Sequence, residues 1–140
     1  PGETEEDFTE LAFFVKEIGF DRLGCFAYSA EEGTPAARYE DQVPEDVRVR
    51  RQEIISELQA RIMEDGAAAK EGREIEVLVE GYDRYAGSFY GRSQADAPEV
   101  DPNVFFTADA RSLNAGELVT VRVTGHLDCD LLGELVSREV

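Results

Sequence analysis

The chain has 140 residues, of which 31 are acidic and 14 basic, so its net charge is −17, and 42% of its residues are hydrophobic. That hydrophobic content suits a globular protein with a buried core, whereas the strong negative charge argues against a surface that binds nucleic acid. No apolar run approaches the ~20 residues needed to cross a bilayer, and the N-terminus lacks the basic-then-apolar order of a secretory signal, so we expect a cytoplasmic protein without a membrane segment.

The negative charge is spread along the whole chain. Residues 1–69 carry a net charge of −10 and residues 70–140 a net charge of −7. Such a field repels phosphates and attracts basic proteins, although it also serves solubility alone. The charge therefore favours a basic protein as partner over a nucleic acid.

The first predicted element is a helix that begins after Thr4. Its hydroxyl can cap the first turn, Asp7 stands three residues later as in a capping box, and Gly19 provides a stop. Apolar residues recur at the spacing of one helix face, at Phe8, Leu11, Ala12, Val15 and Ile18. One face of this helix must be buried.

A near-continuous apolar run, Leu23–Tyr28, follows and is typical of a β-strand covered on both faces. One helix and one strand cannot cover each other in that way. We therefore expect this unit to be the end of a larger α/β domain whose remainder lies outside the chain.

A second helix is predicted from Pro44 to about Met63. It has one apolar stripe, formed by Val47, Ile54, Ile55, Leu58 and Ile62, and its charged residues lie largely off that stripe. It is interpreted as a connecting helix, with a module boundary between Gly66 and Gly72.

From Arg73 onward the hydrophobic period changes to that of strands. Five short strands are predicted near 73–80, 88–91, 104–107, 118–124 and 132–136, with turn signals between them. Gly125 and Gly133 permit the bends that closure needs. The expected fold is a small all-β barrel.

The stretch 91–101 joins two of these strands and is the best candidate for a working loop. It combines glycine, arginine and proline with three carboxylates, which suit a basic partner. An acidic surface loop without a particular role is the alternative. The predicted partner-binding residues are Arg92, Asp96, Pro98, Glu99 and Asp101, together with Tyr82; core packing is an equal alternative for the tyrosines Tyr82 and Tyr90.

Residues suited to catalysis or metal binding are scarce. Cys25 and Cys129 lie far apart in sequence and are expected to be reduced thiols, and His126 is the only histidine. We predict no catalytic residue, no metal ligand and no cofactor within this chain.

Several motifs together resemble the C-terminal portion of radical-SAM methylthiotransferases. In chain order they are Pro1-Gly2-Glu3-Thr4-Glu5-Glu6-Asp7-Phe8, Phe26-Ala27-Tyr28-Ser29, Glu32-Gly33-Thr34-Pro35-Ala36, Val43-Pro44-Glu45 with Arg51, Val77-Leu78-Val79-Glu80-Gly81, and Arg92-Ser93 with Asp96-Ala97-Pro98-Glu99-Val100-Asp101. The last motif is most similar to the RimO branch, which methylthiolates an aspartate of a small-subunit ribosomal protein.

The resemblance implies an α+β fragment in three parts. Residues 1–43 would be the C-terminal tail of a radical-SAM domain with a partial TIM-type barrel, 44–69 a connecting helix, and 70–140 a TRAM domain, an OB-like barrel of five antiparallel strands. The whole enzyme would use S-adenosylmethionine and iron–sulfur clusters, but the CxxxCxxC signature is absent from this chain, so the fragment alone is not expected to be an enzyme. Cofactor contacts, if present, would lie at the C-terminal ends of barrel strands, at Glu3, Thr4 and Ser29.

Three functions stay open. The first is substrate recognition in a RimO-type enzyme, with the barrel docking a basic ribosomal protein and the fragment being a monomer. The second is the RNA-binding portion of a tRNA methylthiotransferase, which would need basic residues and exposed aromatics together on one barrel face; residues 70–140 contain one lysine. The third, an independent enzyme, lacks a nucleophile and base in a usable order.

Overall fold

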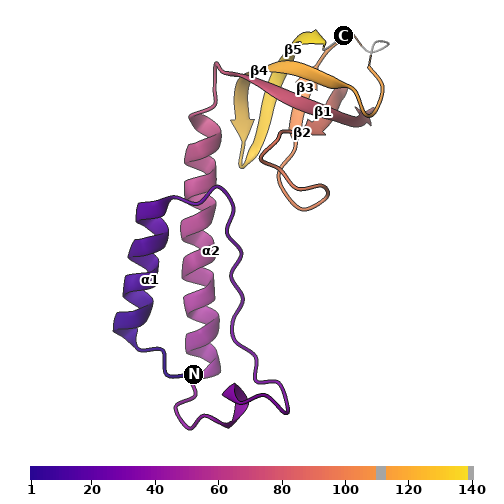
Figure 1. Cartoon of the computed structure of the whole chain (residues 1–140). Helices are drawn as coiled ribbons and strands as arrows, with labels where there is room; N and C mark the ends of the chain where they lie inside the picture. The colour runs from indigo at the N-terminus through magenta and orange to yellow at the C-terminus, as the bar shows by residue number, and fades with distance from the viewer. Residues whose placement is uncertain (110–112, 139–140) are drawn as a thin grey trace. The chain divides into compact units, whose positions relative to one another are not determined.

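The computed structural model describes residues 1–109 and 113–138, which form two compact units, Pro1–Met63 and Glu64–Val140. The first unit contains helix α1 (Glu5–Ile18), the short 3-10 helix η1 (Ala36–Arg38) and most of helix α2 (Glu45–Ala68). The second holds the end of α2 and five strands (Figure 1).

Helix α1 begins and ends where local chemistry predicts. Thr4 Oγ1 accepts the Asp7 backbone N–H at 3.1 Å, and Asp7 Oδ2 accepts the Thr4 N–H at 2.8 Å, which completes the capping box. The hydrogen bond from the Thr4 N–H, with a smaller effect of the Thr4 hydroxyl, holds the pKa of the Asp7 carboxyl below its usual value. At the other end, Gly19 adopts a left-handed conformation with φ of 63° and donates to Val15 O. Both predicted ends of the helix are confirmed.

Replacing Thr4 by alanine is expected to destabilise the first unit by about 1 kcal/mol, because the Asp7 amide loses its acceptor. Thermal unfolding followed by circular dichroism measures the change. Thr4→Ser, which keeps the hydroxyl, is the matched control and should stay within about 0.5 kcal/mol of the parent. Equal destabilisation by both variants would contradict a capping role.

The first unit has a small core between α1 and α2. Phe8, Val15 and Ile55 are its buried residues, and partly buried neighbours pack around them: Ala12, Phe20, Leu23, Cys25, Ile54, Leu58 and Ile62. On α1 the side chains of Phe13, Phe14 and Ile18 remain more than half exposed. The apolar face of this helix is therefore only partly covered within its unit.

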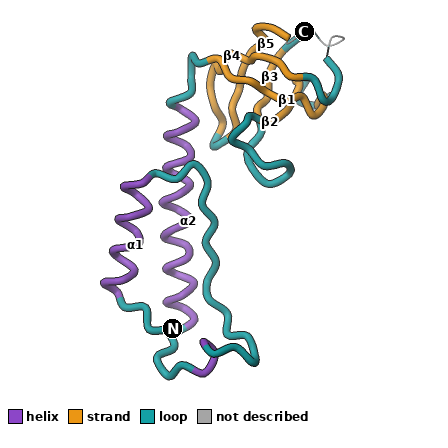
Figure 2. Tube along the Cα trace, in the orientation of Figure 1, coloured by secondary structure: helices purple, strands orange, loops and turns teal. Residues whose placement is uncertain are grey.

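The predicted strand at Leu23–Tyr28 is wrong for the chain as it stands. The segment is extended but pairs with no strand among the described residues. It lies along α2 as a loop (Figure 2), and α2 side chains donate to two of its carbonyls, Gln52 to Cys25 at 3.3 Å and Arg48 to Tyr28. Just before the segment, Gln59 donates to the Phe20 carbonyl at 2.7 Å. A strand needs a neighbouring strand, and here helix side chains satisfy its carbonyls instead.

The second unit is a closed barrel. Its strands are β1 (Glu74–Asp83), β2 (Ser88–Arg92), β3 (Val104–Thr107), β4 (Leu118–Leu127) and β5 (Asp130–Arg138), in the order β1-β2-β3-β5-β4 with β4 returning to β1. Alternate residues point inward, as predicted. The core consists of Ala67 from the last turn of α2 and Val77, Val79, Phe89, Val104, Phe106, Val119, Val121, Val123 and Leu131.

The expectation of five antiparallel strands needs correction. Four neighbouring pairs are antiparallel, but β3 and β5 run parallel, with Phe105 paired to Leu132. The reason is topological: strand directions cannot alternate all the way round a ring with an odd number of members, so one pair must be parallel. Helix α2 also runs to Ala68, five residues beyond its predicted end near Met63.

Candidate docking surface of the barrel and the pocket of the helical unit

The predicted working loop is folded on itself by its own carboxylates. Asp96 Oδ2 accepts the Ser93 N–H at 3.1 Å and the Ser93 hydroxyl at 2.6 Å. Asp101 Oδ2 accepts the Ala97 N–H at 2.7 Å, and the Asp101 N–H donates to Ala97 O. Asp96 is buried, so its carboxylate stabilises the loop from within.

The rest of this loop is more accessible. Pro98 and Glu99 are exposed, as is Val100 at 82%, and Glu99 has a left-handed φ of 61°. At the start of the loop, Arg92 Nε donates to Glu80 Oε1 at 3.0 Å, a half-buried ion pair that ties the loop to β1. Of the three predicted carboxylates, Glu99 is therefore the one most open to solvent.

Tyrosines of the β1–β2 hairpin form an aromatic surface. Tyr82 is 40% exposed and meets Phe89 edge-on at 4.9 Å between ring centroids. Tyr90 lies over Gly81, where a Cβ would come within 2.7 Å of the Tyr90 hydroxyl, and its ring is tilted against Phe105 at 6.5 Å. Tyr85, at the hairpin tip, is fully exposed. Tyr82 thus combines packing against Phe89 with partial exposure, and its predicted contact to a partner stays a prediction.

A groove on the outside of the barrel was missed by sequence reasoning. It has a volume of about 610 Å³ and runs over β3 and β5, bounded by the β1–β2 hairpin and the β4–β5 turn. Phe105, Leu127 and Leu132 supply its apolar surface, and Asp83, Asp130 and Glu134 supply its charge. The sequence did contain one indication of this groove. Leu132 is apolar, yet it follows the buried Leu131 in the strand and therefore points outward.

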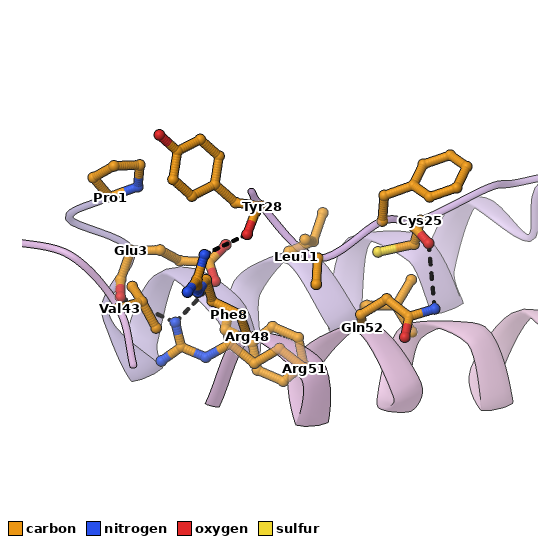
Figure 3. A pocket seen from close by; sticks show the side chains of 13 residues that line it. Pro1, Glu3, Phe8, Leu11, Cys25, Tyr28, Val43, Arg48, Arg51 and Gln52 are labelled. Carbon is orange, nitrogen blue, oxygen red and sulfur yellow. Dashed lines mark hydrogen bonds and ion pairs between the residues drawn. The ribbon is translucent and has the colours of Figure 1, made fainter. Parts of the chain in front are cut away.

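The first unit has a pocket of about 240 Å³ between α1, α2 and the extended segment. Figure 3 shows Arg51 of α2 pointing toward Glu3. Arg51 Nη1 lies 2.8 Å from Glu3 Oε1, and Arg51 Nη2 lies 2.9 Å from Glu5 Oε1. The guanidinium also stands over the Phe8 ring at 5.4 Å. Hydrogen bonds to Glu5 first, and to Glu3, raise the pKa of Arg51, so its charge is permanent.

The three residues predicted to contact a cofactor do not come together in this pocket. Glu3 lines it, but Thr4 caps α1 and Ser29 lies exposed beyond Tyr28. The Tyr28 hydroxyl is buried without a hydrogen-bond partner within the described part of the chain, the feature that best suits a polar ligand. Burial raises the pKa of the Cys25 thiol, and the nearby Glu3 charge adds to this, so the thiol stays protonated at neutral pH.

The residues present do not fit an iron–sulfur cluster. Cys25 and Cys129 are partly buried thiols in different units. Across residues 1–109 and 113–138, no group of three or more His, Cys, Asp or Glu side chains is arranged to hold a metal ion. Neither α1 nor α2, the helices of the described residues, is long and apolar enough to cross a membrane.

Comparison with known protein families decides what the barrel is. Residues 72–136 match the TRAM domain family. The barrel is a TRAM domain. The match covers all five strands up to Val136, so the closed five-stranded barrel is consistent with the predicted TRAM domain.

The chain as a whole is similar to proteins named ribosomal protein uS12 methylthiotransferase RimO. It is 46% identical over 138 residues to that of Phocaeicola vulgatus, 47% over 137 residues to that of Desulforudis audaxviator, and 45% over 138 residues to that of Geobacter sulfurreducens. These alignments cover 97–98% of this chain but only 30–31% of each relative. The resemblance to RimO-type methylthiotransferases is confirmed, and the chain spans about a third of the length of these relatives.

Proposed function

We propose that this chain is the substrate-recognition portion of a RimO-type radical-SAM methylthiotransferase, and that its TRAM domain docks the basic ribosomal protein uS12. The observation that carries the proposal is the charge of the TRAM domain: residues 70–140 hold 14 acidic and 7 basic side chains. A barrel of this charge draws in a lysine- and arginine-rich protein and repels phosphates. The relatives' name, which specifies uS12, supports the same partner.

The organisation proposed for the parent enzyme follows the resemblance. Residues 1–43 would be the C-terminal end of its radical-SAM domain, residues 44–69 the helix that connects this domain to the barrel, and residues 70–140 the TRAM domain. The exposed apolar side chains of α1 and the unpaired segment 23–28 support a missing neighbour for the first unit. S-adenosylmethionine and iron–sulfur clusters would be held by the rest of the enzyme, which would act in the cytoplasm, and this portion would be monomeric.

The loop that begins at Arg92 stays a predicted contact to the partner. Asp96 and Asp101 accept hydrogen bonds within the loop, so changing them alters its fold as well as its charge. Glu99 is the suitable probe, since it is exposed.

A specific observation favours a second candidate, RNA binding in the manner of a tRNA methylthiotransferase. Tyr82, Tyr85, Tyr90 and Arg84 border one shallow surface of the barrel, and exposed aromatics beside a cation can stack on bases. Asp83 borders the same surface, and its charge opposes a phosphate backbone.

Titration of the full chain separates the two candidates. We expect measurable binding to purified uS12 that weakens as salt is raised, and much weaker binding to a tRNA anticodon stem-loop at the same salt. Each exposed ion pair contributes only about 0.2–1 kcal/mol, so several contacts must act together. Calorimetry at low and moderate salt is the measurement. Tighter binding to the RNA would move the function to the tRNA branch, and no binding to uS12 would refute the proposal.

A further inference from the structure

We propose that the outer groove over β3 and β5 is where the TRAM domain holds its partner, and that it takes an extended basic protein segment carrying an apolar anchor residue. The inference rests on the proposed function and assigns the docking of the partner to named residues. It makes the groove the main contact and leaves the loop that begins at Arg92 a secondary one.

The floor of the groove is an apolar ledge. Phe105 on β3 is paired with Leu132 on β5, and both side chains point outward, since their neighbours Phe106 and Leu131 are buried in the core. Leu127, where β4 ends, is 65% exposed and Leu132 is 38% exposed. Such a ledge gains free energy when an apolar side chain displaces its water.

The rim of the groove is acidic, and hydrogen bonds hold two of its carboxylates in place. Asp83 Oδ1 accepts the N–H groups of Tyr85 and Ala86 at 2.8 and 3.1 Å, and Asp130 Oδ1 accepts the Asn103 N–H at 2.8 Å. Glu134 completes the rim, and none of the described lining residues is a lysine or arginine. Fixed carboxylates around an apolar floor suit a segment in which lysine or arginine flanks an apolar residue.

The position and charge of the groove together select this occupant. The face between the first and last hairpins of an OB-type barrel is a common ligand surface, and in nucleic-acid binders it is basic and aromatic. Here it is acidic, which disfavours RNA. A second copy of this chain would bring the same carboxylates against one another, because a two-fold interface pairs a patch with itself. A basic protein is neither repelled by the acidic rim, as RNA would be, nor brings further carboxylates against it, as a second copy would.

The test measures the affinity of full-chain variants for uS12 by calorimetry and stopped-flow association. Leu132→Ser is expected to weaken binding about tenfold, mainly through faster dissociation. Glu134→Gln is expected to weaken it about threefold, mainly through slower association, and this difference should fade at high salt. An amide NMR spectrum of each variant verifies that the barrel remains folded.

Matched controls lie on the same unit but away from the groove. Val136→Ser changes an apolar β5 residue that is 42% exposed, and Glu71→Gln removes an exposed carboxylate; both should bind like the parent. Glu99→Gln probes the loop and should have a smaller effect than Leu132→Ser.

The outcomes separate the two levels of the proposal. If the parent binds uS12 but the groove variants bind equally well, or if Glu99→Gln weakens binding more than they do, the groove assignment is overturned and the proposed function stands. If the parent does not bind uS12, the proposed function fails and the groove assignment falls with it. Displacement of bound uS12 by the tRNA stem-loop, lost in Leu132→Ser, would assign the groove to RNA instead.

Discussion

Replacing Gly91 by alanine is expected to lower the melting temperature of the TRAM domain by about 15 °C. Gly91 on β2 is buried and paired with Val79 on β1. An added Cβ would overlap the backbone oxygen of Leu78 and stand 2.9 Å from Val77 Cγ1. Backbone atoms in a closed barrel cannot move aside singly, so the overlap costs about 3 kcal/mol.

Gly125→Ala on β4 is the matched control for this prediction. A Cβ at Gly125 would meet no heavy atom within 4 Å, so a change below about 0.5 kcal/mol is expected. Thermal unfolding followed in the far ultraviolet measures both variants. If Gly91→Ala melts with the parent, the close packing of β1 against β2 is incorrect.

The second large effect concerns the two units of the same chain. Amide hydrogens in β4 are expected to exchange about 100-fold more slowly than those in α1. The barrel buries Val119, Val121 and Val123 of β4 in a closed core, whereas α1 contributes only Phe8 and Val15 to the buried core of its unit. Local opening of α1 therefore exposes much less apolar surface than opening of the barrel.

Hydrogen exchange of the full chain, read residue by residue by NMR, tests this expectation. The slowest amides should lie in β1 and β4, and those of α1 should exchange through local opening. Protection of α1 equal to that of β4 would show that the first unit is as stable as the barrel and needs no further neighbour.

Both units contain features that short-range chemistry determines. The capping box of Thr4 and Asp7 and the stop at Gly19 involve residues three or four positions apart, so the sequence sufficed to predict α1. Likewise, the alternation of Val119, Val121 and Val123 with polar residues predicted which side chains of β4 point inward. That one neighbouring pair in a closed barrel of five strands must be parallel could have been deduced as well, but that the pair is β3 and β5 could not.

Other features depend on partners that the sequence does not place. The run Leu23–Tyr28 has the composition of a strand, but a strand forms only beside another, and the described chain offers it the side chains of α2 instead. In the loop that contains Asp96, composition suggested carboxylates facing a partner, yet the folded loop needs acceptors for its own amides and takes them from Asp96 and Asp101.

By itself, the sequence determined the helix ends, the inward residues of the strands, the acidic charge and the resemblance to RimO-type enzymes, because each depends on neighbouring residues or on composition. Only the tertiary structure decided that the apolar ledge of Phe105 and Leu132 lies beneath the carboxylates of Asp83, Asp130 and Glu134. These residues come from β1, β3 and β5, which are far apart in the sequence. Closure of the barrel brings them to one face, because strand register sets which distant side chains become neighbours.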